Sequence, residues 1–271
     1  MKNKPLLICE YLGGSHSYGL ETPTSDADYR GIYLNTELDQ IINQRYQNSS
    51  VATIDSKSSD EISDTDCVYY ELRHFFHLLR KGNTQSIELL FNTVWLDKNS
   101  LFQDIQDARH SLVDPVKLND AVKGYAYSEY KLAIGERPGK IGAKRQSMVE
   151  QYGFSPKNFV NLFRLLHCTA KFYMTGHFPV RIDEPFVMAQ LKEIKNHPDR
   201  FTIQSLNDIH EFYKNYHQAS WLNNSTEICE DYKYDSEVAS KLTLACYIGQ
   251  LDHHRATNLS LMGRIKQVFK P

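Results

Sequence analysis

The stretch Gly13-Gly14-Ser15-His16-Ser17-Tyr18-Gly19, followed after six residues by Asp26-Ala27-Asp28-Tyr29-Arg30-Gly31, carries the strongest indication of fold in this sequence. An apolar run, Leu6 to Cys9 and then Tyr11-Leu12, precedes it and has the length of a strand that ends at the glycine pair. The residues after the pair are small. Gly14 and Ser15 therefore predict a loop whose backbone N–H groups and hydroxyl can surround phosphate oxygens.

Two aspartates follow this loop at a spacing of two residues. Pro23 ends any helix begun at Ser17, and we expect a strand to start at Asp26 because the residues after it favour strands. On a strand, Asp26 and Asp28 project from one face, with Cα atoms about 6.6 Å apart. Two such carboxylates can share a pair of cations that lie roughly 3.5–4 Å apart. The pattern therefore indicates metal-assisted phosphoryl or nucleotidyl transfer.

Three other interpretations use the same residues. A calcium-binding EF-hand loop would begin at Asp26, but Arg30 then stands where a ligand oxygen belongs, and Pro23 lies in the entering helix. The nucleophile elbow of an esterase would need a glycine where Ser17 stands. A surface turn with two solvated aspartates is the third alternative.

The spacing also resembles that of a known superfamily. Gly14-Ser15 followed by Asp26-x-Asp28 is similar to the signature of the DNA polymerase β-like nucleotidyltransferases. A longer pattern resembles the predicted nucleotidyltransferases associated with RNA-repair genes, and its matching positions are Gly14, Ser15, Tyr18, Gly19, Ser25, Asp26, Asp28, Arg30 and Gly31. The likeness continues in patches at Lys81-Gly82-Asn83, Glu88-Leu89-Leu90, Arg164-Leu165-Leu166 and Pro179-Val180. Asn161 departs from the family, which has a histidine near this position.

The resemblance implies an activity and a set of site residues. It implies transfer of a nucleoside monophosphate from an NTP, ATP included, to an acceptor hydroxyl, with two Mg²⁺ ions bound by Asp26 and Asp28. It places Gly14, Ser15, Tyr18 and Ser25 in the nucleotide-binding motif. Candidate countercharges for the phosphates are Arg30, Lys157 and Arg164. The acceptor that it implies is an RNA end, tRNA included.

The superfamily usually takes a third carboxylate from a neighbouring strand, and the resemblance directs the search to the apolar run that begins near residue 66. The candidates are Asp64, Asp66 and Glu71. We favour Asp66 as the third catalytic and metal-binding residue because it stands at the start of that run, and the other two remain alternatives.

The whole chain predicts an α+β protein. A small mixed-sheet nucleotidyltransferase domain is expected over residues 1–114, and an all-helical C-terminal domain over 115–271. Ser155 and Pro156 predict the start of a long helix that runs to Met174. Two later helices, Leu206 to His217 and Glu237 to Leu251, are expected to be separated by the polar segment Asn223 to Asp235.

Basic residues recur on two of the expected helices. They are Arg137, Lys140 and Lys144 on one, and Lys157, Arg164 and Lys171 on the other. No acid occurs from Gln151 to Ile182, so the second helix is expected to present a positive face to a phosphate-rich partner, the RNA acceptor. A solvated helix face is the alternative for the first group. Two other function classes stay open, namely nucleotidylation of a protein or small molecule and a non-catalytic nucleotide-binding or RNA-binding module.

Composition limits the remaining possibilities. The chain has 271 residues and a formal net charge of -2, so binding of nucleic acid would have to use a local patch. Its five cysteines lack zinc-site spacing, which predicts reduced thiols and a cytoplasmic location. No apolar run approaches the length of a membrane span or of a signal peptide, so no membrane association is expected.

Overall fold

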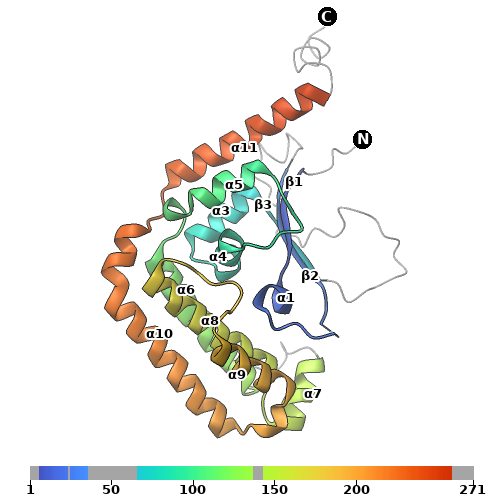
Figure 1. Cartoon of the computed structure of the whole chain (residues 1–271), viewed down its shortest axis with the longest axis vertical. Coiled ribbons are helices and arrows are strands. Elements are labelled where there is room, and N and C mark those ends of the chain that lie inside the picture. The colour runs from blue at the N-terminus through green and yellow to red at the C-terminus, as the bar shows by residue number, and fades with distance from the viewer. Residues whose placement is uncertain (1–5, 24, 36–65, 137–142, 258–271) are drawn as a thin grey trace, which may run out of the picture.

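The computed structural model describes residues 6–23, 25–35, 66–136 and 143–257. Within these ranges, four strands form one sheet in the order β3-β2-β1-β4. The strands are β1 (Leu6–Leu12), β2 (Asp28–Leu34), β3 (Asp66–Glu71) and β4 (Asp97–Lys98). β1 is antiparallel to β2 and β4, whereas β2 is parallel to β3. The sheet is therefore mixed, and the predicted α+β class is confirmed (Figure 1).

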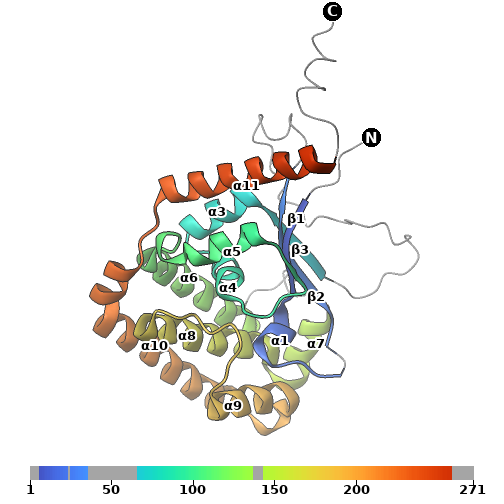
Figure 2. The same ribbon diagram turned by 45° about the horizontal axis from the view of Figure 1, so that its top comes forward.

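One face of the sheet is covered by helices. Cys9 and Ile32 are register partners on β1 and β2, and both are fully buried. On this side lie α3 (Leu72–Arg80), α4 (Thr84–Phe91) and α5 (Ser100–Asp107), as Figures 1 and 2 show. The apolar residues Leu72, Phe75, Phe76 and Leu79 form the buried side of α3. Because strand residues two apart share a face, Asp28 and Arg30 belong to the same covered face as Ile32.

The rest of the chain is helical and is built around α8 (Pro156–Thr175). This helix starts with Pro156 and ends at Gly176, which has a positive φ of 68°, so its predicted start is confirmed. It packs against α6 (Pro115–Ala133), α9 (Pro185–Asn196) and α10 (Ile203–Asp231). The other elements are α7 (Ala143–Tyr152), α11 (Ser236–Thr257) and the short 3₁₀ turns Arg109–Ser111 and Pro198–Arg200.

Three expectations about secondary structure are wrong. The residues after Gly13 form a short helix, α1 (Gly14–Tyr18), rather than a loop. β2 begins at Asp28, so Asp26 precedes the strand. The polar segment from Asn223 to Asp231 continues α10, because Ile228 keeps this part of the helix packed on the core with 2% of its surface exposed. Only Tyr232 to Asp235 separates α10 from α11.

The two halves share one hydrophobic core. α6 starts directly after Asp114, whose carboxylate accepts a hydrogen bond from the Lys117 N–H at 3.0 Å. α11 then returns to the first half and packs on α3 and α5 (Figure 2). The Tyr247 hydroxyl on α11 donates to Glu71 at 3.0 Å. The domain boundary at 114/115 stays a prediction. None of the described helices has both the length and the apolarity that a membrane span requires.

Candidate active site

The carboxylate of Asp28 lies directly against the start of α1. Gly14 has a φ of +58°, and a Cβ atom on it would lie 1.9 Å from Asp28 Oδ2. The Gly13 N–H donates to the Asp28 carbonyl oxygen at 2.6 Å, which holds the first strand residue to the residue before α1. Glycine is therefore required at position 14 for two reasons, its left-handed backbone and its contact with the carboxylate. The motif brings the phosphate-binding candidate and the metal-binding candidate into contact.

Asp66 is the register partner of Asp28 on the parallel strand β3. Neighbouring strands lie about 4.8 Å apart, and register partners of parallel strands share a face of the sheet. The structure describes Asp66 by its backbone alone, and its role as third carboxylate stays a prediction. Of the alternatives, Asp64 lies outside the described residues.

Glu71 is committed to a structural role. Its side chain is fully buried and caps the start of α3, accepting from the Arg73 N–H at 2.9 Å. It also accepts a hydrogen bond from Tyr247. These bonds occupy both carboxylate oxygens, and Glu71 stands on the opposite face of β3 from Asp66.

Asp26 and Ser25 lie in the turn before β2. Asp26 is exposed and precedes β2, so the prediction that it lies on the strand with Asp28 is wrong. The Ser25 hydroxyl accepts from the Thr22 N–H at 2.9 Å and closes this turn. Among the described side chains, no three acids, histidines or cysteines are grouped as a metal site. The Asp28 carboxylate nevertheless has the hard oxygen atoms that Mg²⁺ prefers as ligands. Its contact with Gly14 fixes the position of this carboxylate.

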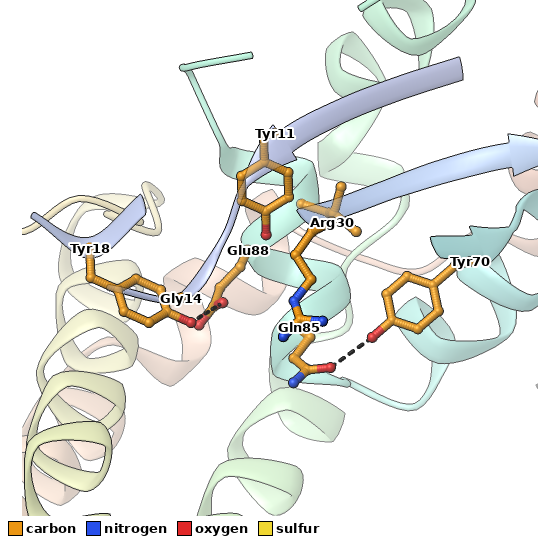
Figure 3. A pocket seen from close by; sticks show the side chains of 8 residues that line it. Tyr11, Gly14, Tyr18, Arg30, Tyr70, Gln85 and Glu88 are labelled. Atoms are coloured by element: carbon orange, nitrogen blue, oxygen red, sulfur yellow. Dashed lines mark hydrogen bonds between the residues drawn. The ribbon is translucent and has the colours of Figure 1, made fainter. Parts of the chain in front are cut away.

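A small polar cavity of about 40 Å³ lies beside the start of α1 (Figure 3). Arg30 projects into it from β2, and its Nη2 atom is 4.0 Å from Asp28 Oδ1. The Tyr70 hydroxyl donates to Gln85 Oε1 at 2.7 Å on the far side. The remaining lining residues are Tyr11, Gly14, Tyr18, Glu88 and Leu89. This volume is large enough for a water molecule and too small for a nucleobase.

A buried ion pair adjoins this cavity. Arg164 on α8 and Glu88 on α4 are 2.8 Å apart at Nη1 and Oε1, with 7% and 4% of their side chains exposed. The Tyr18 hydroxyl donates to Glu88 Oε2 at 2.8 Å. The guanidinium carbon of Arg164 lies 3.6 Å from the centre of the Tyr18 ring. Burial alone would lower the pKa of Arg164, but Glu88, Tyr18 and Cys168 together outweigh the effect of burial, and the pKa is raised.

The expectation of one positive face on α8 is therefore wrong. Arg164 is buried, and Lys171 lies 2.8 Å from Glu184. Burial would raise the pKa of Glu184, but Lys171 and His167 lower it to about 2. Lys157 is exposed as expected. The acids that pair with these bases come from α4 and from the residue before α9. Of the other basic group, Arg137 and Lys140 lie outside the described residues, and Lys144 is described by its backbone alone.

A second cavity, of about 310 Å³, lies on the other side of α1. His16 and Ser17 of α1 line it, whereas Gly14 and Tyr18 line the small cavity. Its polar lining residues include His177, Arg181 and Asp183. Burial, assisted by Arg109, lowers the pKa of His177, so the imidazole is neutral near pH 7.

Glu88 is the residue of this site to which no role was assigned from the sequence. It stands within the apolar run Ile87-Glu88-Leu89-Leu90-Phe91, all of which is buried in α4. An acid inside such a run is the one signal that could have indicated a buried partner for a base.

Comparison with known proteins adds one family and one relative. A family model, RlaP, described as the RNA repair pathway DNA polymerase beta family, matches residues 4–144, about half of the chain. An uncharacterized 38.9 kDa protein in the nrdC-mobD intergenic region of Enterobacteria phage T4 is 30% identical over 100 residues. These residues are 35% of this chain and 30% of the phage protein, so the match covers less than a third of that relative. No solved structure shows a significant match.

Proposed function

Because the chain belongs to the RNA repair pathway DNA polymerase beta family, we propose that it transfers a nucleoside monophosphate from an NTP to an acceptor hydroxyl and releases pyrophosphate. The observation that carries this proposal is the contact between Gly14 and Asp28, with Asp66 in register beside Asp28. That arrangement joins a phosphate-binding backbone to a pair of carboxylates.

Each part of the motif has a separate proposed task. The start of α1 binds the β and γ phosphates through the backbone at Gly14 and the hydroxyl of Ser15. Asp28 and Asp66 would hold Mg²⁺, and Asp26, in the exposed turn before β2, would be a further ligand. The ions supply Lewis acidity toward the acceptor hydroxyl and countercharge for the pyrophosphate. Arg30 holds Asp28 in place from the cavity side and adds positive charge near the phosphates.

The proposed acceptor is an RNA end, tRNA included. The family description supports an RNA substrate. Lys157 is the exposed base on α8 that supports a phosphate contact. Arg137, Lys140 and Lys144 remain proposed contacts on sequence grounds. Arg164 and Lys171 are not proposed as RNA contacts, because each is already paired with a carboxylate.

The test is label transfer from each α-labelled NTP, with Mg²⁺, to separate pools of RNA and protein. We expect label on RNA with the wild-type protein and none above background with Asp28→Asn. Asp199→Asn, which makes the same change at an exposed site in a 3₁₀ turn, is the control and should retain activity. Label on protein alone would reassign the acceptor. NTP binding without transfer to any acceptor would contradict the enzyme proposal and favour a binding module.

A further inference from the structure

The helical half of the molecule holds α1 at several points. The Ile182 N–H donates to the Tyr18 carbonyl oxygen at 3.4 Å, and Lys195 Nζ donates to the Leu20 carbonyl oxygen at 2.5 Å. Arg181 lies 3.9 Å from Glu21. The first of these contacts acts on the backbone of the last residue of α1, and the other two act on residues just after the helix. They leave the orientation of α1 about its own axis to be set by a side chain.

Tyr18 is that side chain. It belongs to the last turn of α1, and its ring is held on two sides, by the hydrogen bond to Glu88 and by the guanidinium of Arg164 above the ring. A planar guanidinium both pairs with a carboxylate and stacks on an aromatic ring, which an ammonium group cannot do equally well. Burial and Glu88 raise the pKa of Tyr18, although Arg164 lowers it, so the hydroxyl keeps its proton and remains a donor.

We propose that Glu88 and Arg164 are positioning residues that fix α1, and with it the backbone at Gly14, through Tyr18. Arg164 therefore acts from behind the helix and does not contact the phosphates. This inference rests on the proposed function in one respect, that the start of α1 binds the NTP.

The geometry of α1 couples the position of the Tyr18 ring to the position of the Gly14 backbone. Gly14 lies four residues before Tyr18, one helical turn away, so a rotation of α1 that moves the tyrosine ring also moves the backbone against Asp28. Gly14, Tyr18 and Glu88 all line the small cavity (Figure 3). Removing one member of a buried charge pair leaves the other member unpaired, so the arrangement tolerates little displacement.

Tyr18→Phe is the most informative variant, because it removes one hydroxyl and retains the ring beneath Arg164. Tyr213→Phe is a matched control, since the Tyr213 hydroxyl also donates to a side chain, Gln190, at 2.8 Å and the residue is 2% exposed. Both variants should lower the melting temperature by similar amounts. We expect Tyr18→Phe alone to raise amide hydrogen exchange in α1 about tenfold, as for the loss of one buried hydrogen bond. It should also raise the Kd and KM for the NTP by about tenfold, with kcat changed less than threefold.

A second variant separates charge from shape. Arg164→Lys keeps a positive charge for Glu88 but loses the planar group above Tyr18, so α1 exchange should rise in this variant as well. Unchanged exchange in α1 and unchanged NTP affinity in Tyr18→Phe would overturn the proposal, whether or not the lysine variant folds. Equal changes in α1 exchange and in NTP affinity in Tyr18→Phe and Tyr213→Phe would also overturn it, because the tyrosine would then contribute only to general stability. Amide hydrogen exchange does not depend on catalysis. If the wild-type protein transfers no label, the enzyme proposal is refuted, but the exchange measurement still tests the role of Glu88 and Arg164.

Discussion

Substitution of Gly14 by alanine should damage the site in a way that the structure allows to be measured. The new Cβ atom would lie 1.9 Å from Asp28 Oδ2, and contacts under 3.0 Å are essentially never seen for real Cβ atoms. The carboxylate oxygen must therefore move by about 1.1 Å. A displacement of about 1 Å in a reacting group costs on the order of 100-fold in rate. We expect kcat/KM for nucleotidyl transfer to fall by about that factor in Gly14→Ala.

Alanine at position 14 is also strained, because its φ of +58° is left-handed, and this costs roughly 1–2 kcal/mol of folding free energy. Gly153→Ala separates the two effects. Gly153 has a φ of +78°, and a Cβ atom there would meet nothing within 4 Å. Both variants should lose similar stability in urea unfolding, whereas only Gly14→Ala should lose transfer activity.

The assay is initial-rate transfer from a labelled NTP, corrected for the folded fraction of each variant. Activity of Gly14→Ala within about twofold of wild type would refute the reasoning, because Asp28 would then function without the position that it has beside Gly14. Equal loss of activity in Gly153→Ala would refute it as well, since the effect would then follow from backbone strain alone.

Three further predictions concern stability and RNA binding. Glu88→Ala should lower the free energy of unfolding by about 3–5 kcal/mol, because it leaves Arg164 buried without its partner. The Glu184 side chain is 27% exposed, so Glu184→Ala should cost about 1 kcal/mol or less. Urea unfolding measures both changes. Burial, assisted by Lys123, lowers the pKa of His217 to about 4 from an ordinary value of 6.5. As the pH falls, His217 is therefore protonated at a higher pH in the unfolded chain than in the folded protein. The free energy of unfolding should therefore fall by up to about 3 kcal/mol as the pH drops from 6.5 to 4, and His217→Gln should flatten that slope; an unchanged slope would show that His217 does not titrate in this window. Lys157→Ala should reduce the salt dependence of RNA binding by about 0.7 in log–log slope, and an unchanged slope would make Lys157 an ordinary surface residue.

Local signals in the sequence were sufficient for several elements. Pro156 marks the start of α8 and Gly176 its end, because each residue has a backbone preference that needs no tertiary contact. The spacing of two between Asp28 and Arg30 places them on one face of β2, and the start of the apolar run places Asp66 at the start of β3. These features depend on residues close to one another in the chain.

The environment of Arg164 could not be predicted in the same way. Its stretch of sequence contains no acid, which indicated an exposed positive face, yet Glu88 and Glu184 reach α8 from other elements. Pairing across such sequence separations depends on how the helices pack. The same holds for α1, whose five residues are too few to show helical periodicity and whose form depends on contacts with Asp28, Glu88 and the helical half.

The position of Asp66 in register with Asp28 is the centre of the proposed mechanism, and the transfer rate of Asp66→Asn tests it most directly. Glu71→Gln is the comparison, because Glu71 is the neighbouring acid that caps α3. Asp66→Asn should lose at least 100-fold in transfer rate with an unchanged melting temperature, whereas Glu71→Gln should lower the melting temperature and keep its activity per folded molecule. Full activity in Asp66→Asn, with loss of transfer in folded Glu71→Gln, would contradict the account.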